Sequence, residues 1–226
     1  MKARPILFSD EMVRALLDGR KTQTRRLVPG WQLPKECKSY DKRFPENKYI
    51  SIAQRHRKYG FGVFGETEEK CMNNLVYASC CPCGNTGDYL YVKESYAPLN
   101  NPQGAITGYI YSADYPNFSK KDGRDWNWKS GRFMPKTASR LTLQITHISV
   151  ERVQDITELD AISEGCPGDS WFIHPQLGYT TEEGVLPTEE YEELWIKING
   201  LQSWNQNPWV WVIEFEVIQK NISELI

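Results

Sequence analysis

The sequence has no long hydrophobic run, and this absence excludes one class of protein at once. No stretch of about 18 consecutive apolar residues occurs, so we expect no membrane-spanning helix. The first residues, MKARPILFSDEMV, also lack a long apolar region and a small-residue cleavage site, so we expect no secretory signal. The chain is therefore predicted to be cytoplasmic, without a membrane partner.

Histidine is scarce, and the cysteines do not form a clean metal-ligand pattern. The three histidines, His56, His147 and His174, are isolated in the sequence and have no ligand spacing. In a cytoplasmic protein the six cysteines are expected as reduced thiols or as metal ligands, not as disulfides. The segment CCPCG (80–84) suggests a structural zinc site that would hold residues 29–86 in place. Its candidate ligands are Cys37, Cys71, Cys81 and Cys83, and reduced thiols are the alternative.

Internal repeats and low-complexity tracts are also missing, and the rest of the composition is that of a globular protein. The chain is 40% hydrophobic and 25% charged, which is enough for a sizeable core. We predict a single domain over residues 1–226, and two small domains are the alternative. It is expected to contain an irregular insertion at about 29–86 and a loop-rich aromatic and basic segment at about 97–140.

The net charge is small, but the charges are segregated along the chain. Residues 120–140 carry seven cations against two acids, and residues 151–195 carry twelve acids against one cation. A basic face of this kind is the electrostatic footprint of a phosphate-bearing partner. The alternative is that the two segments fold beside each other and neutralise.

Hydrophobic spacing and capping residues predict three short helices. The first follows Ser9, a good N-cap, and ends at Gly19. The second covers 155–165, where Thr157 and Asp160 resemble a capping box. The third covers 188–200, with Thr188 as its cap and a stop at Gly200.

Alternating apolar residues predict strands at 87–96, 140–153 and 209–218. The alternation in 140–153 changes phase near His147, which indicates a bulge. Strands and helices without a regular βαβ order favour an α+β fold with a curled or barrel-like sheet.

The segment GRKTQTRR, residues 19–26, is the strongest candidate for chemistry. Cations after a helix end meet the negative end of its dipole, and this explains the first two of them. Hydroxyls between cations also suit an oxyanion or phosphate site, or a nucleophile beside its activator. The cations and hydroxyls of this segment are Arg20, Lys21, Thr22, Thr24, Arg25 and Arg26.

Two acidic residues and one aromatic segment add to the candidates. Glu164 lies in the last turn of its predicted helix, where the dipole disfavours an acid by roughly 0.3–1 kcal/mol, so it is either tolerated there or kept for a task. Glu94 ends a hydrophobic strand, where functional residues collect. Residues 120–140 interleave cations such as Arg132 with Trp126 and Trp128, the pattern of a base-stacking surface or of tryptophans packed on a core.

Five blocks of the sequence resemble the ASCH family, a PUA-like group of small β-barrel proteins. They occur in the family's order, and the resemblance is strongest to the longer members found in bacteriophages and prophages. The blocks are ILFSDEMVRALLDGRKTQTRR (6–26), GDYLYVKESY (87–96), YSAD (111–114), residues 128–165 and NPWVWVIEF (207–215).

The resemblance implies a PUA-like curled barrel with a cleft beside the first helix, suited to RNA or a modified nucleobase. Small bacterial members of the family remove the acetyl group from N4-acetylcytidine with a Lys, a Thr and a Glu. Their G-x-K-T-x-T motif is present here at Gly19, Lys21, Thr22 and Thr24. The Glu that follows an alanine by three positions corresponds to Glu164. The resemblance thus implies Thr24 as nucleophile, Lys21 as its activator and Glu164 as the proton-handling carboxylate, with no cofactor for the chemistry.

The sequence therefore predicts a protein that binds RNA or a modified nucleoside and hydrolyses an N-acyl group from cytidine. The alternatives are a non-catalytic RNA-binding module, a metal-independent ribonuclease using Lys21 with Glu94 or Glu164, and a surface that captures a host factor. In each RNA-binding reading the substrate contacts include Arg20, Thr22, Arg26, Glu94, Trp126, Trp128 and Arg132.

Overall fold

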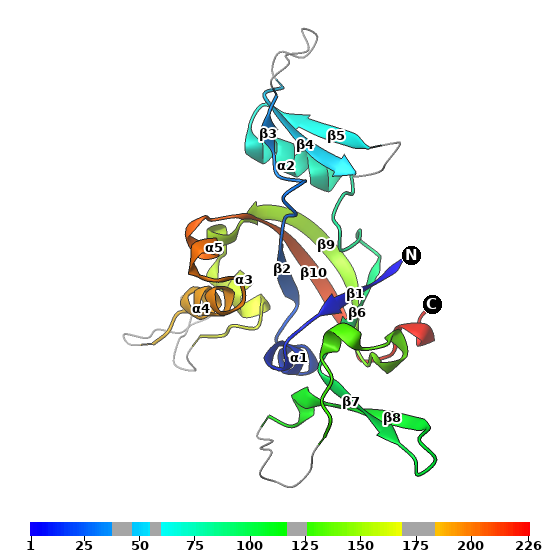
Figure 1. The fold of residues 1–226 in the computed structure, drawn as a ribbon. Coiled ribbons are helices and arrows are strands. Elements are labelled where there is room, and N and C mark those ends of the chain that lie inside the picture. The colour runs from blue at the N-terminus through cyan, green and yellow to red at the C-terminus, as the bar shows by residue number, and fades with distance from the viewer. Residues whose placement is uncertain (38–46, 55–59, 117–125, 169–183) are drawn as a thin grey trace. The chain divides into compact units, whose positions relative to one another are not determined.

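The computed structural model describes residues 1–37, 47–54, 60–116, 126–168 and 184–226, and these form a mixed α+β fold (Figure 1). The described residues form ten strands and five α-helices, together with short 3-10 turns. Within the same residues no helix is both long enough and apolar enough to cross a membrane.

The elements follow one another without a regular alternation. The strands are β1 (Ala3–Leu7), β2 (Gln23–Leu27), β3 (Lys35–Glu36), β4 (Tyr49–Gln54), β5 (Phe61–Gly65), β6 (Tyr89–Lys93), β7 (Tyr96–Asn100), β8 (Ile106–Tyr111), β9 (Thr142–Arg152) and β10 (Trp209–Ile218). The helices are α1 (Asp10–Leu17), α2 (Glu68–Tyr77), α3 (Glu158–Ser163), α4 (Pro187–Asn199) and α5 (Leu201–Asn205).

Contacts within the chain divide it into two compact units. Unit 1 comprises Met1–Thr22, Gly87–Ile145 and Phe215–Ile226, and unit 2 comprises residues 23–86 and 146–214. The main sheet has the strand order β1-β6-β9-β10-β2, and the division falls inside β9 and inside β10. Two smaller sheets have the orders β3-β4-β5 and β7-β8. The described strands show no pairing between β1 and β2 that would close the main sheet into a barrel.

In unit 1 the sequence signals predict α1 and β6, but the expectation of a loop-rich segment at 97–140 is wrong where the hairpin β7–β8 forms. Ser9 caps α1, since its hydroxyl accepts a hydrogen bond from the Met12 amide. The chain turns away from the helix axis at Gly19, whose φ is +73°. Leu90 and Val92 of β6 are fully buried while the tyrosines beside them are half-buried, as their alternation predicts. β6 pairs in parallel with β1 and antiparallel with the first part of β9. The hairpin β7–β8 packs Tyr96 against a small core.

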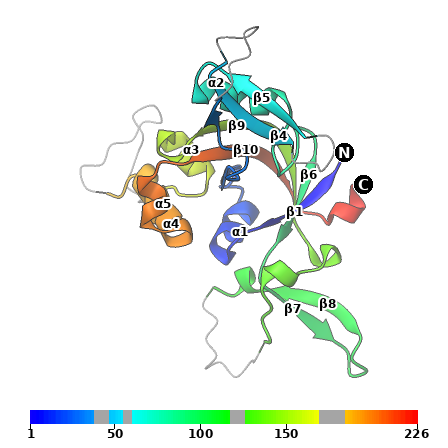
Figure 2. The same cartoon turned by 45° about the horizontal axis from the view of Figure 1, so that its top comes forward.

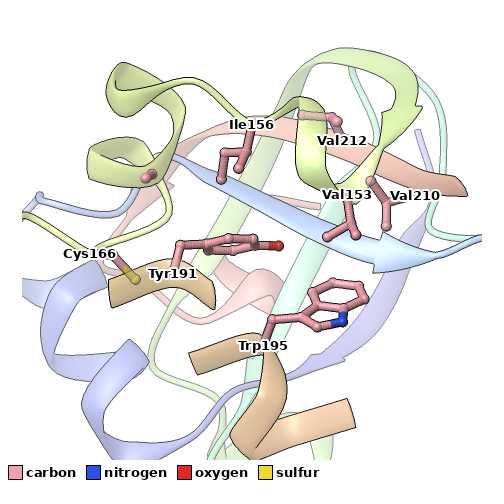
Figure 3. Packing of buried hydrophobic residues seen from close by; sticks show 8 residues of the cluster. Val153, Ile156, Cys166, Tyr191, Trp195, Val210 and Val212 are labelled. Carbon is pink, nitrogen blue, oxygen red and sulfur yellow. The ribbon is translucent and has the colours of Figure 1, made fainter. Parts of the chain in front are cut away.

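In unit 2 the core lies between α4 and the strands (Figure 3). Tyr191 and Trp195 extend from α4 toward Val153, Val210 and Val212, with ring centroids of the two aromatics 6.2 Å apart. β2 pairs antiparallel with β10 through residues 23–27 and 210–214. The capping box of Thr157 and Asp160 at α3 is confirmed. β9 also changes phase as predicted, because Thr146 and His147 are both exposed between buried isoleucines.

One helix start was predicted wrongly. α4 begins at Pro187 with Leu186 as its N-cap, so Thr188 is already inside the helix. The hydroxyl and amide of Thr188 instead donate hydrogen bonds to Glu158 of α3, at 2.8 and 3.2 Å. The reason is that Pro187 has the fixed φ that suits the first helical position.

The expectation of an irregular insertion at 29–86 is also wrong for its described residues. They form the three-stranded sheet β3-β4-β5 with α2 along one face, as Figures 1 and 2 show. Cys71, Met72 and Leu75 of α2 are completely buried. The sequence signals for this sheet were weak because β4 and β5 are short. β5 also contains Gly62 and Gly65, and glycine is uncommon in strands. The prediction of a single domain over 1–226 stays a prediction.

Gly65 provides a test of this packing. A Cβ at this position would lie 2.4 Å from the backbone nitrogen of Cys71, so Gly65→Ala must displace α2 from β5. We expect Gly65→Ala to lower the free energy of unfolding by about 1–3 kcal/mol in urea denaturation. Gly30→Ala is the control, because a Cβ at Gly30 meets nothing within 4 Å. Equal stability of the two variants would contradict the packing described here.

Candidate functional site

Lys21 lies in unit 1 at the exit of α1, and its side chain is buried. After Gly19 the chain turns back, so the amides of Arg20 and Lys21 both donate to the carbonyl of Ala15, at 2.9 and 3.0 Å. Only 1% of Lys21 is exposed, and its Nζ lies 5.6 Å from the centroid of the Phe8 ring. A buried lysine is rare in proteins, and the cation–π contact offsets part of the cost of removing the charge from water.

Thr24 lies in unit 2, on β2 opposite Ile213 of β10, and is likewise 1% exposed. Its Oγ1 accepts a hydrogen bond of 3.1 Å from Nη1 of Arg26, which also donates to the carbonyl of Arg25. The hydroxyl therefore has a fixed cationic neighbour. This arrangement suits a group that develops negative charge on its oxygen.

Glu164 is the C-cap residue of α3 and is 4% exposed. Its Oε1 accepts a hydrogen bond from the backbone amide of Arg25 and lies 3.6 Å from Nη1 of the same residue. The contacts with Arg25 explain how an acid is accommodated at the negative end of a helix dipole, because a charge-assisted bond outweighs the dipole cost.

Arg25 is the centre of a buried cluster in unit 2 that the sequence analysis missed. Its Nε and Nη2 lie 2.7 and 2.6 Å from Oε1 of Glu151 on β9, and Nη2 lies 3.6 Å from Asp160 on α3. Its guanidinium carbon lies 5.8 Å from the ring centroid of Tyr191 on α4. Gln23 completes the cluster with a bond of 3.1 Å to Asp160. The available signal was the acid-rich run beginning at Glu151, which needed a cationic partner.

The pKa shifts of this cluster follow from burial and from Arg25. Burial raises the pKa of Glu151, although the charge of Arg25 acts against it. Burial alone would also raise the pKa of Asp160, but hydrogen bonds from Thr157 and Gln23, with the charge of Arg25, bring it below its usual 3.8. Burial raises the pKa of Tyr191, so its phenol stays protonated near neutral pH.

Glu94 is completely buried at the end of β6, in unit 1, and is engaged by one arginine. Nε and Nη2 of Arg140 donate to its two oxygens at 2.9 Å each. Arg140 also binds Asp114 at 2.8 Å and lies 4.0 Å from the ring centroid of Tyr111. Burial raises the pKa of Glu94 against the opposing effect of Arg140. A bidentate pair of this kind fixes the end of the strand.

The predicted aromatic residues gather in unit 1. Tyr115 lies 6.5 Å from Trp126 and 6.2 Å from Trp128 between ring centroids, and both tryptophans are half-buried. Arg132 is exposed, while Arg20 is paired with Asp18 at 3.0 Å. Thr22 is exposed and its carbonyl accepts a bond from Phe215.

The cysteines do not assemble a metal centre within the described part of the chain. No group of three or more His, Cys, Asp or Glu side chains there is placed to hold a metal ion. Burial raises the pKa of Cys71 to about 11, and a hydrogen bond with Cys83 followed by burial raises that of Cys81. Thiols of this kind are poor metal ligands until they lose their protons. The zinc site stays a prediction.

No family model matches the chain, and comparisons with curated proteins and with solved structures give no match either. The ASCH resemblance therefore stays a prediction that rests on the motifs of the sequence.

The Arg25 cluster predicts a large stability effect. Arg25→Met keeps an unbranched apolar stem but removes the guanidinium and leaves buried carboxylates without their cation, so we expect a loss of about 3–5 kcal/mol in unfolding free energy at pH 7. Arg20→Met is the control, because its exposed ion pair with Asp18 is worth about 0–1 kcal/mol.

The pH dependence gives a second readout for the same variant. The folded-state pKa of Asp160 is lowered, so its carboxylate stabilises the fold above pH 3.8, and this contribution is lost as the pH falls through the folded pKa. The difference between Arg25→Met and the wild type should therefore shrink below pH 3.8. A difference that is independent of pH would argue against an electrostatic role.

Proposed function

We propose that this protein binds RNA or a modified nucleoside through an aromatic and basic surface of unit 1. The observation that carries the proposal is the cluster of Tyr115, Trp126 and Trp128: the Tyr115 ring lies 6.5 and 6.2 Å from the two indole rings, and all three are only partly buried. Indole rings that remain accessible are stacking platforms for bases.

Cations follow directly after the tryptophans in the chain. Lys129 is exposed, and its backbone pairs with Tyr96 of β7 through two hydrogen bonds of 2.7 and 3.1 Å. The exposed Arg132 comes next, and its carbonyl accepts a bond of 2.6 Å from Nζ of Lys93. Cations held on ordered backbone can contact phosphates while the rings contact bases. The PUA-like character of the fold belongs to the same proposal.

Replacing the tryptophans tests this surface. Trp126→Ala with Trp128→Ala should weaken binding of a fluorescein-labelled single-stranded RNA, because each lost base stack costs about 1–3 kcal/mol, roughly 5- to 150-fold in Kd. Fluorescence anisotropy at several salt concentrations measures the change. Tyr77→Ala, an exposed aromatic at the end of α2, is the control. Trp126→Phe with Trp128→Phe should retain most of the affinity. Unchanged binding in the alanine variant would remove the basis of the proposal.

Hydrolysis of an N-acyl group from cytidine is a second candidate, favoured by the burial of Lys21, Thr24 and Glu164. These polar residues are the ones to which the ASCH resemblance assigns the chemistry, and polar side chains removed from water are typical of functional sites.

In the reaction that the ASCH resemblance implies, the Thr24 oxygen attacks the acetyl carbonyl and passes its proton to neutral Lys21. The bond to the cytosine nitrogen then breaks, and the Glu164 carboxylate relays that proton from Lys21 to the nitrogen, so both groups return to their starting states. Water hydrolyses the resulting ester, which releases acetate and restores the threonine hydroxyl.

An acetate-release assay with N4-acetylcytidine tests this candidate. Thr24→Ala and Lys21→Met should each lower the rate at least about 100-fold, since nucleophile and base contribute most of the catalysis. Lys70→Met, which removes an exposed lysine of α2, should keep the wild-type rate. RNA bound intact without acetate release would leave the non-catalytic binding module, and cleavage of the RNA strand would instead support the ribonuclease.

A further inference from the structure

Phe133 is an aromatic residue that a fixed turn of unit 1 presents to solvent, with 74% of it exposed. It ends the 3-10 turn Gly131–Phe133, and the residues on either side of the exposed pair 132–133 are buried. A Cβ at Gly131 would lie 2.8 Å from the backbone of Glu94, so the turn packs closely against the residue that follows β6. The backbone of Phe133 is therefore positioned by the fold.

Two hydrogen bonds hold the backbone carbonyls of the exposed pair. Oη of Tyr96 donates to the carbonyl of Phe133 at 3.1 Å, and Nζ of Lys93 donates to the carbonyl of Arg132 at 2.6 Å. A segment that is already ordered loses little conformational entropy when a ligand binds. The turn is thus suited to present an aromatic ring and a cation side by side to a ligand.

A single exposed ring is common on protein surfaces, so the charges beside Phe133 decide what it can bind. Residues 126–140, all of them described, contain four cations and no acid. One of the four, Arg140, is engaged by two buried or half-exposed acids. The exposed Lys129 and Arg132 have no ion pair with any acid in the part of the chain that the structure describes. These two cations are therefore available to an anionic ligand.

Two aromatic residues and two cations follow one another in this segment, in the order Trp128, Lys129, Arg132 and Phe133. Tyr96 keeps the aromatic residues apart, because its backbone pairs with Lys129 while its hydroxyl, at the far end of the side chain, binds the carbonyl of Phe133. A nucleoside has no phosphate for the two cations to contact. A strand has a phosphate between each pair of bases, so its groups match the order of rings and cations.

We propose that the ligand of the aromatic and basic surface of unit 1 is a single strand of RNA with at least two nucleotides, not a free nucleoside, and that Phe133 is its second base-stacking residue. One base stacks on the indole rings, Lys129 and Arg132 contact the phosphate that follows, and the next base stacks on Phe133. Contacts linked in one strand bind more tightly than either contact alone. Stacking of this kind tolerates any base. The inference rests on the proposed RNA binding and names the form of the ligand.

The test is an anisotropy titration of the full chain with a fluorescein-labelled uridine 12-mer, together with competition by unlabelled uridine monophosphate. Phe133→Ala should weaken binding of the 12-mer roughly 5- to 150-fold, the loss expected for one stacked base. It should also narrow the difference between the dissociation constants of the 12-mer and the monophosphate, because only the strand reaches Phe133. General damage to the surface would weaken both ligands alike.

Matched variants check the parts of this arrangement. Phe133→Trp should retain the affinity for the 12-mer, since it keeps a ring at the same place. Arg132→Met should lower the salt dependence of binding by about 0.7 units of slope, the value for one phosphate contact on a single strand. Tyr77→Ala, which removes an exposed aromatic ring of α2, should bind like the wild type. Thermal unfolding followed by circular dichroism confirms that Phe133→Ala is folded.

The outcomes separate this inference from the proposed function. If the wild type binds neither ligand, both fail together. If the Trp126→Ala, Trp128→Ala variant is weakened while folded Phe133→Ala binds the 12-mer normally, only the role of Phe133 and the strand is overturned. Equal affinity of the wild type for the monophosphate and the 12-mer overturns it as well, because a strand would then add no contact. If Phe133→Ala leaves RNA binding unchanged but alters the molar mass measured by light scattering, the ring is a protein contact and its assignment to RNA is wrong.

Discussion

The buried guanidinium of Arg25 is the interaction on which the arrangement of unit 2 depends. It comes from β2 and contacts Glu151 of β9, Asp160 and Glu164 of α3, and the ring of Tyr191 on α4. Four elements that are distant in the sequence thus meet around one charge. The cost of burying that charge is recovered only with its partners in place, so the cluster specifies one packing of the strand against the helices. The packing that Arg25 selects is stabilised further by the buried apolar area of the core, which includes Tyr191, Trp195, Val210 and Val212.

This dependence changes the meaning of the motif in residues 19–26. Arg25 is a structural cation, and it is also what holds Glu164 at the end of α3. Thr24 precedes it on β2 and receives its hydrogen bond from Arg26. Successive strand residues point to opposite faces, so β2 places Gln23 and Arg25 in the buried cluster and Thr24 and Arg26 on its other face. Thr24 therefore stands on a rigid element, as a group that must hold its geometry requires.

The parts of the fold that could be predicted from the sequence are those whose signal is local. The cap at Ser9, the capping box at Thr157, and the long strands β9 and β10 depend on spacing within one element, and they are confirmed. The sheet β3-β4-β5 was missed because its stability comes from α2 packing over a glycine, and such a contact leaves no periodic pattern. The Arg25 cluster was missed because Arg25 lies more than 120 residues from its acidic partners in the sequence. Pairing over that distance is set by topology.

The distribution of acids resolves the question that the segregated charge raised. The described acids of residues 151–195 are largely engaged at helix ends and around Arg25. Asp155 accepts from the Arg152 amide, Glu158 binds Thr188, and Glu190 accepts from the Gly168 amide at 2.7 Å. These carboxylates accept hydrogen bonds from backbone amides of unit 2 and pair with the buried Arg25 of the same unit. A net charge near zero is therefore compatible with exposed cations such as Lys129 and Arg132, because much of the balancing negative charge is committed to holding the fold.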